Sequence, residues 1–206
     1  MARSVNRLEL IRPNWPAALR IAAAATTRAG GHSTGRFAEL NLANHVGDKP
    51  ETVARNRKIL ATELDLPEAP RWLQQGHGAQ VADAAEVSVL TPADTIISNT
   101  PGQVCAVLTA DCLPVLLCDR EARHVGAIHA GWRGLLDGVI EASIEALERR
   151  GVAASSMLVW LGPAIGPSVY EVGSDVRDGC LRRYPDCSGV FSPSRLERWQ
   201  MDLYAL

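Results

Sequence analysis

Three side chains of this sequence, His77, Cys112 and His129, are of the types that bind a transition metal. They are separated by 35 and 17 residues, unlike the closely spaced ligand pairs of a zinc finger. Three ligands gathered from separate elements describe a catalytic zinc site, whose fourth position is left to water or substrate. One sulfur and two nitrogen donors favour Zn²⁺ over Mg²⁺ or Ca²⁺, which prefer oxygen. Copper is the alternative, because a single site of this type also accepts Cu²⁺.

The same residues could do different chemistry. Cys112 could act as a nucleophile, with His129 as its general base and Asp111 as the group that orients the imidazole. Both interpretations use Cys112 and His129, and the sequence alone leaves them open. His77 stands between Gly76 and Gly78, where no neighbouring side chain crowds it, but this pattern alone is a weak signal.

A β-hairpin is expected to bring Cys112 and His129 together. Residues 113–118 and 124–130 are short runs rich in Val, Leu and Ile, and the link between them is polar. A turn centred between residues 120 and 121 would set Cys112 directly opposite His129. Opposed side chains on one face have Cβ atoms about 4.5–5.5 Å apart, close enough to share one ion.

Two arginines are candidates for holding an anion. The turn Gly131–Gly134 carries Arg133 and opens an amphipathic run from Leu135 to Arg149, so a flexible, cationic turn lies at a predicted helix N-terminus. Arg57 falls on the apolar stripe of a helix predicted to begin near Asp48. Its guanidinium either faces inward, where phosphate or a carboxylate would be its partner, or reaches water over its apolar stem.

The remaining pattern predicts alternating strands and helices within one domain. Gly151 is expected to end the helix that follows the hairpin, and the run Gly162–Pro167 is expected to be an irregular loop. The other expected strands cover residues 21–27, 94–98, 104–108 and 157–161, and the other expected helices cover residues 48–64 and a segment across 170–181.

The composition narrows the class of protein. With 206 residues, 21% charged and 47% hydrophobic, the chain is an ordinary globular sequence. A net charge of −2 without a Lys/Arg stripe argues against a nucleic-acid partner. No apolar run approaches the roughly 18 residues of a membrane span, and the N-terminal stretch lacks the apolar core of a signal peptide. We therefore expect a cytoplasmic protein, with reduced thiols at its five cysteines.

The sequence resembles the YfiH or laccase-domain family, formerly called polyphenol oxidases and also known as peptidoglycan editing factors. The shared motifs occur in the family's order along nearly the whole chain. They are Thr27-Arg28 with Gly30-Gly31, Leu40-Asn41-Leu42, His45-Val46-Gly47-Asp48, Asn56-Arg57, Gln75 with His77-Gly78, Thr109 to Val115, His129 to Gly134, and Leu161 to Pro167 with Tyr170 to Gly173.

The resemblance implies an α+β fold, in which helices flank a mixed β-sheet core. This is the YfiH-like cysteine-hydrolase fold that a bacterial toxin deamidase shares. The family's zinc ligands align with His77, Cys112 and His129, and an active-site arginine aligns with Arg57. Residues 1–206 would form a single YfiH-like domain, whereas the family's chains usually continue past the position of Leu206 with further strands.

The activity implied by the resemblance is zinc-dependent phosphorolysis of purine nucleosides (adenosine, inosine and methylthioadenosine), with adenosine deamination alongside. Nucleoside and phosphate would then be the small-molecule partners, with phosphate held by Arg57, Arg133 and the turn Gly131–Gly134. Two alternatives remain. One is a copper-dependent polyphenol oxidase, although five histidines are too few for a multicopper cluster. The other is a Cys/His hydrolase that edits peptidoglycan precursors.

Overall fold

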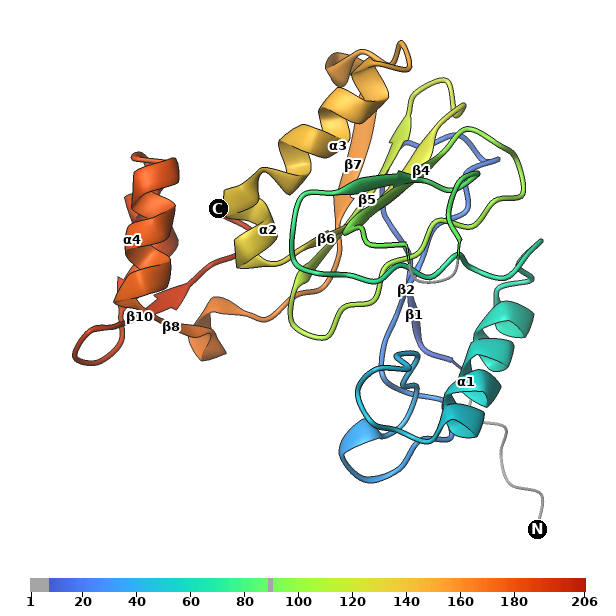
Figure 1. Cartoon of the computed structure of the whole chain (residues 1–206), viewed down its shortest axis with the longest axis horizontal. Helices are drawn as coiled ribbons and strands as arrows, with labels where there is room; N and C mark the ends of the chain where they lie inside the picture. The colour runs from blue at the N-terminus through green and yellow to red at the C-terminus, as the bar shows by residue number, and fades with distance from the viewer. Residues whose placement is uncertain (1–7, 89–90) are drawn as a thin grey trace.

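The computed structural model describes residues 8–88 and 91–206 and shows a mixed α+β architecture (Figure 1). Residues 1–7, which are part of the N-terminal stretch discussed above, lie outside the described residues. None of the helices in the described part of the chain has the length and apolarity needed to cross a membrane. The α-helices are α1 (Pro50–Glu63), α2 (Trp132–Asp137), α3 (Val139–Glu148) and α4 (Ser174–Arg183).

The main sheet has five strands in the order β3-β4-β6-β5-β7. β3 runs parallel to β4, and the other neighbours are antiparallel, so the sheet is mixed, as expected. Its strands are β3 (Val81–Asp83), β4 (Thr95–Ser98), β5 (Leu113–Asp119), β6 (Val125–Ala130) and β7 (Met157–Leu161).

The two faces of this sheet have different partners. Val115 and Ile128 face one side and pack in a core cluster with Val139 and Leu147 of α3. Because side chains alternate along a strand, Ala127 faces the other side, where its cluster includes residues of the irregular segment before β3 and between β3 and β4. His129 has the parity of Ala127 and therefore lies on the face away from α3.

The hairpin register differs from the expected one by two residues. Pro114, rather than Cys112, lies opposite His129. The centre of the turn lies one residue further along the chain than expected, and there the carboxylate of Asp119 accepts the N–H groups of Arg123 and His124 at 2.7 and 2.8 Å. A shift of two keeps every side chain on its face, whereas a shift of one would have exchanged the faces. Cys112 therefore still shares a face with His129, diagonally instead of directly opposite.

Some other expectations about elements were wrong. The helix after the hairpin is divided at Gly138, which has a φ of 85° and separates α2 from α3. Residues 104–108 form only an isolated bridge between Arg71 and Cys105. Residues 171–173 are a strand instead of the start of a helix. Helix α1 and strands β4 and β7 occur where they were expected, and Lys49 holds the N-cap position of α1 without a side-chain hydrogen bond.

Two smaller units flank the main sheet (Figure 1). One contains α1 and a two-stranded sheet, and the other contains α4 and a three-stranded sheet in the order β8-β10-β9. The strands are β1 (Leu10–Ile11) and β2 (Ala25–Thr26) in the first, and β8 (Glu171–Gly173), β9 (Phe191–Pro193) and β10 (Arg198–Met201) in the second. Short 3₁₀ turns cover Gly35–Phe37, Ala154–Ser156, Pro167–Val169 and Cys187–Val190.

Candidate metal centre

The structure brings His77, Cys112 and His129 together, with one potential ligand atom from each lying within 4.8 Å of the others. His77 lies in the loop before β3, Cys112 directly precedes β5, and His129 is on β6. The two imidazole rings meet edge to face with centroids 4.6 Å apart. His129 is buried, Cys112 is partly buried, and His77 is exposed. One side of the cluster is therefore open to a ligand from solvent.

A buried carboxylate, Asp94, orients His129. Asp94 has no exposed surface, and its Oδ1 lies 2.8 Å from Nδ1 of His129. The backbone N–H of His129 also donates to the carbonyl oxygen of Asp94 at 2.7 Å. Because Nδ1 is engaged by the carboxylate, Nε2 is the nitrogen of His129 left for a metal. Such a carboxylate–histidine pair is the usual support of a histidine metal ligand.

The same carboxylate also positions His77. Asp94 accepts the backbone N–H groups of Gly76, His77 and Gly78 at 3.2, 2.9 and 2.8 Å. His77 has a φ of 60°, a left-handed conformation that few non-glycine residues adopt, and the three hydrogen bonds hold the loop in it. One side chain thus supports two of the three candidate ligands.

Gly131 is needed for the close packing of the cluster. A Cβ atom at this position would lie 2.8 Å from Sγ of Cys112 and 3.0 Å from Cδ2 of His77. Gly134 has a related role in the same turn, since a Cβ there would lie 3.0 Å from the carbonyl oxygen of Gly78. These glycines let the N-terminal turn of α2 approach the His77 loop.

The electrostatics suit a metal. Burial lowers the pKa of His129, although the hydrogen bond to Asp94 opposes it, so the imidazole is neutral at physiological pH. Burial raises the pKa of Asp94, but the hydrogen bonds from His129 and from the 76–78 loop outweigh it and leave that pKa below its ordinary value. Burial, followed by the charges of Asp111 and Asp94, raises the pKa of Cys112. A neutral imidazole and a thiol that loses its proton to a cation are competent ligands, so this group can bind a metal.

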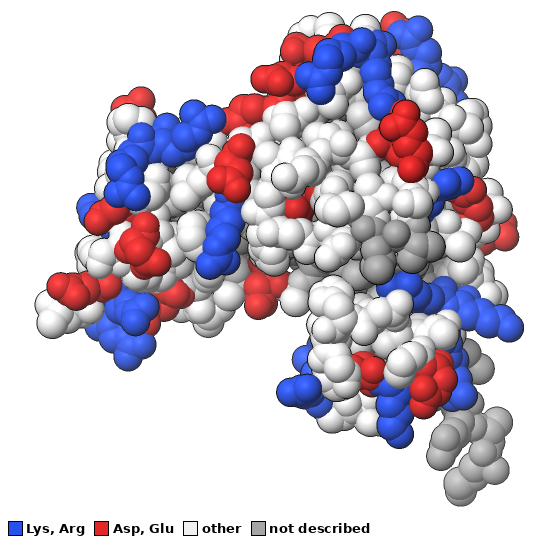
Figure 2. All heavy atoms as spheres, viewed as in Figure 1, with Lys and Arg blue, Asp and Glu red and all other residues white. Residues whose placement is uncertain are grey.

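The cluster opens into a large cavity of about 2030 Å³ between the main sheet and the unit that contains α1. On the face shown in Figure 2, Lys and Arg are interspersed with Asp and Glu. Among the described residues that line the cavity, the one acidic side chain is Asp111, whereas its arginines are Arg12, Arg20, Arg28, Arg36, Arg123 and Arg150. Arg123 and Arg150 are paired with Glu121 and Asp83, and the other four arginines leave the cavity suited to an anionic ligand.

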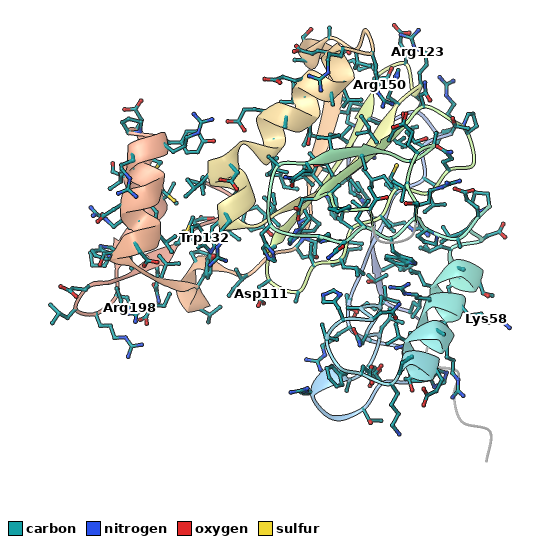
Figure 3. The ribbon with its side chains drawn as sticks, in the orientation of Figure 1. Lys58, Asp111, Arg123, Trp132, Arg150 and Arg198 are labelled. Carbon is teal, nitrogen blue, oxygen red and sulfur yellow. The ribbon has the colours of Figure 1, made fainter. Side chains whose placement is uncertain are left out.

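Asp111 is exposed, near the end of the main sheet where Trp132 also lies (Figure 3). The carboxylate that His129 contacts is that of Asp94, so the orienting role considered for Asp111 is filled by a residue that the sequence did not single out. Its only signal was a carboxylate directly before the apolar run of β4.

Arg57 was expected either to face inward or to reach water over its apolar stem, and the structure places it between these two alternatives. Its side chain is neither fully buried nor free in water: Nε donates to the carbonyl oxygen of Leu42 at 2.9 Å, and the guanidinium stacks 4.2 Å from the Trp72 ring. Burial lowers its pKa from the ordinary arginine value. Leu42 and Trp72 both line the cavity. No contact joins Arg57 to the metal ligands in the described part of the structure.

Arg133 is exposed and stacks on Trp132 at 4.4 Å from the ring centroid. The charge of Arg133 affects the pKa of the Tyr170 phenol, as do the nearby ionisable groups of Cys112 and Asp111. Burial is the main cause that raises the pKa of Tyr170 to about 12, and Arg133 opposes this rise. Arg133 is therefore within electrostatic range of the same phenol as the Cys112 thiol.

Comparison with known proteins gives a consistent result. The family model described as "Multi-copper polyphenol oxidoreductase laccase" matches residues 22–206. A purine nucleoside phosphorylase of Pseudomonas aeruginosa is 46% identical over 197 residues, covering 95% of this chain and 79% of the relative. The purine nucleoside phosphorylase YfiH of Escherichia coli is 43% identical over 199 residues, covering 96% and 80%.

Solved structures agree with the sequence relatives. A Neisseria meningitidis protein superposes with a TM-score of 0.88 at 43% identity, covering 95% of this chain and 79% of the other. YlmD from Geobacillus stearothermophilus superposes with a TM-score of 0.81 at 31% identity, covering 97% and 81%. With the mixed sheet and the His–Cys–His cluster in place, these matches show that the chain belongs to the YfiH, or laccase-domain, family.

Proposed function

We propose that the protein is a zinc-dependent purine nucleoside phosphorylase acting on adenosine, inosine and methylthioadenosine, with adenosine deaminase activity at the same site. The observation that carries the proposal is the cluster of His77, Cys112 and His129, supported by the buried Asp94 and open on one side to the cavity. Relatives that are 43–46% identical bear the name purine nucleoside phosphorylase.

Zinc is the metal that the donor set favours. Two imidazole nitrogens and one thiolate suit Zn²⁺ and leave the fourth position for a substrate. When bound, the ion supplies a Lewis acid that polarises a substrate oxygen or nitrogen. The description of the matching family model favours copper instead, and the two imidazoles and thiolate could accept it. A metal analysis of the purified protein separates these possibilities.

The phosphorolysis itself depends on holding an anion beside the nucleoside. An oxygen of inorganic phosphate forms a bond to the ribose anomeric carbon while the bond from that carbon to the purine nitrogen breaks. The products are ribose 1-phosphate and the free base, which takes up a proton. Arg57, Arg133 and the N–H groups of the turn Gly131–Gly134 are the proposed phosphate-holding groups. The contacts of Arg57 with Leu42 and Trp72, two residues that line the cavity, place its guanidinium beside that cavity and support this role.

The hydrolase alternative has one observation in its favour. Cys112, His129 and Asp94 lie together and could serve as nucleophile, general base and orienting carboxylate, in that order. Against it, the pKa of Cys112 is raised by burial, so the metal-free protein holds a thiol and not a reactive thiolate at neutral pH. We therefore place this activity second.

The deciding experiment is incubation of the zinc-loaded protein with inosine, with and without inorganic phosphate. Hypoxanthine and ribose 1-phosphate are expected only when phosphate is present, and the activity should be lost in His77→Ala, Cys112→Ala and His129→Ala. The Escherichia coli relative, assayed in parallel, controls for the conditions. A zinc-loaded protein that releases no base from inosine, adenosine or methylthioadenosine would make the phosphorylase proposal wrong and favour the hydrolase. Oxidation of a phenol with copper and oxygen, indifferent to phosphate, would favour the oxidase.

A further inference from the structure

The loop after β7 holds the backbone on both sides of Cys112. The N–H of Gly162 donates to the carbonyl oxygen of Pro114 at 2.8 Å, and the N–H of Ile165 donates to that of Asp111 at 2.9 Å. Continuing the β5–β7 register past Leu161 places Ala164 opposite Cys112. Cys112 precedes β5 and lies at the end of the hairpin, so this loop is its main backbone support on the β7 side.

The loop, residues 162–165, contains no regular structure of its own, but one side chain closes it. The hydroxyl of Tyr204 donates to the carbonyl oxygen of Gly162 at 2.8 Å and accepts the N–H of Ala164 at 2.8 Å. Tyr204 is itself held in place, because its N–H donates to the carboxylate of Asp202 at 2.9 Å and the adjacent Leu203 is buried in the core.

We propose that Tyr204 is a positioning residue for the Cys112 ligand, acting through residues 162–165. The proposal rests on the metal binding proposed above. By joining Gly162 to Ala164, the hydroxyl sets the spacing of the two N–H groups that bond the carbonyls of Asp111 and Pro114. The loop in turn sets where Cys112 places its sulfur relative to His77 and His129. Tyr204 remains 44% exposed, so it acts through these two hydrogen bonds and not through burial of its ring.

The test compares Tyr204→Phe with a matched control, Tyr184→Phe. The Tyr184 hydroxyl likewise has two partners, because its one proton is shared between the carbonyl oxygen of Leu135 and the carboxylate of Glu141, at 3.0 and 2.9 Å. It joins the end of α4 to α2 and α3, and none of its hydrogen bonds involves residues 162–165. Both variants remove one hydroxyl and keep the ring, so each should lower the melting temperature by about 2–4 °C in a chain of this size.

Two readouts separate positioning from general stability. Zinc affinity, measured by competition with a chromophoric chelator, should fall about three- to tenfold in Tyr204→Phe and stay unchanged in Tyr184→Phe; the effect is smaller than for direct support of a ligand. In the metal-free protein, hydrogen exchange of the Gly162 and Ile165 amides should accelerate in Tyr204→Phe alone. The optical spectrum of the Co²⁺-substituted protein, which reports the thiolate, should shift in the same variant.

The outcomes distinguish this inference from the proposed function. Unchanged zinc affinity and amide exchange in Tyr204→Phe would overturn the positioning role, as would an equal loss of affinity in Tyr184→Phe. A wild-type chain that binds no zinc would overturn both the metal centre and this role. A chain that shows the Tyr204→Phe effects on zinc but cleaves no nucleoside would retain the positioning role and refute only the phosphorylase activity.

Discussion

Asp94 and His129 are joined twice, by a 2.8 Å hydrogen bond between carboxylate and imidazole and by a 2.7 Å bond between their main chains. The double connection places a buried anion against the imidazole nitrogen that points away from the other ligands. Because the same carboxylate accepts three N–H groups of the loop that carries His77, it couples the positions of two ligands from different elements. The candidate metal centre is therefore organised around a residue that would not itself bind the metal.

Asp94→Asn should weaken zinc binding by about 10- to 100-fold, the usual effect of removing the support of a metal ligand. An amide is uncharged, and one of its two polar atoms cannot accept the N–H groups of the 76–78 loop. The free energy of unfolding should also fall by about 1–3 kcal/mol. Chelator competition and chemical denaturation measure the two effects.

Asp119→Asn is the matched control for this variant. Asp119 is also a buried carboxylate that accepts backbone N–H groups, but it is the last residue of β5, at the end of the strand away from Cys112. The Asp119→Asn protein should be less stable to unfolding but should keep wild-type zinc affinity. Equal zinc affinities of the Asp94→Asn and wild-type proteins would contradict the role assigned to Asp94.

Protein purified without added metal is expected to carry close to one zinc per chain, and Cys112→Ala should lose it because a thiolate ligand is removed. His124→Ala should retain the metal, since His124 precedes β6 at the turn of the hairpin and is not part of the cluster of His77, Cys112 and His129. Elemental analysis of the three proteins gives the answer. Full zinc retention in Cys112→Ala would show that Cys112 is not a zinc ligand.

Gly131→Ala should reduce zinc affinity by about tenfold or more, because the added methyl group would lie 2.8 Å from the sulfur of Cys112 and displace it. Gly166→Ala provides the comparison: its Cβ would meet no atom within 4 Å, and its φ of −75° suits any residue. The measurement is again chelator competition. A Gly131→Ala protein with wild-type zinc affinity would show that the backbone at the start of α2 can shift to accommodate the methyl group.

Arg57→Ala should raise the KM for phosphate or lower kcat while zinc content stays unchanged. Arg57→Lys should restore the activity only in part, because an ammonium group lacks the planar pair of donors. Arg55→Ala on the exposed face of α1 controls for general effects of charge. Steady-state kinetics with varied phosphate test this, and unaltered phosphate kinetics would assign Arg57 to its contacts with Trp72 and Leu42 alone.

Zinc affinity should rise by about tenfold per pH unit through the neutral range. Burial raises the pKa of Cys112, so the metal-free protein holds a thiol whose proton must leave when the ion binds. His129 adds no such dependence there, because burial lowers its pKa below the ordinary value and the ring is already neutral. Competition titrations between about pH 6.5 and 8 measure the slope, and a flat profile would show that Cys112 is not a ligand.

The sequence by itself determined the elements whose residues repeat with clear periodicity. The apolar runs of β4, β5, β6 and β7 and the amphipathic pattern of α1 predicted these elements, because burial on one or both faces imposes a period that a single sequence carries. The face shared by Cys112 and His129 was also predictable, since it depends only on parity. The donor types predicted a metal centre, and the structure places all three of its residues together.

Tertiary structure alone decided the register and the supporting residues. The hairpin shift of two residues accompanies a turn in which Asp119 accepts two backbone N–H groups, and such bonds leave no periodic signal. Asp94 bonds His129, which is 35 positions away in the sequence, and Tyr204 bonds Gly162, which is 42 positions away. A contact across such a distance is set by how the chain folds back on itself, so a single sequence shows the residue types but not which of them meet.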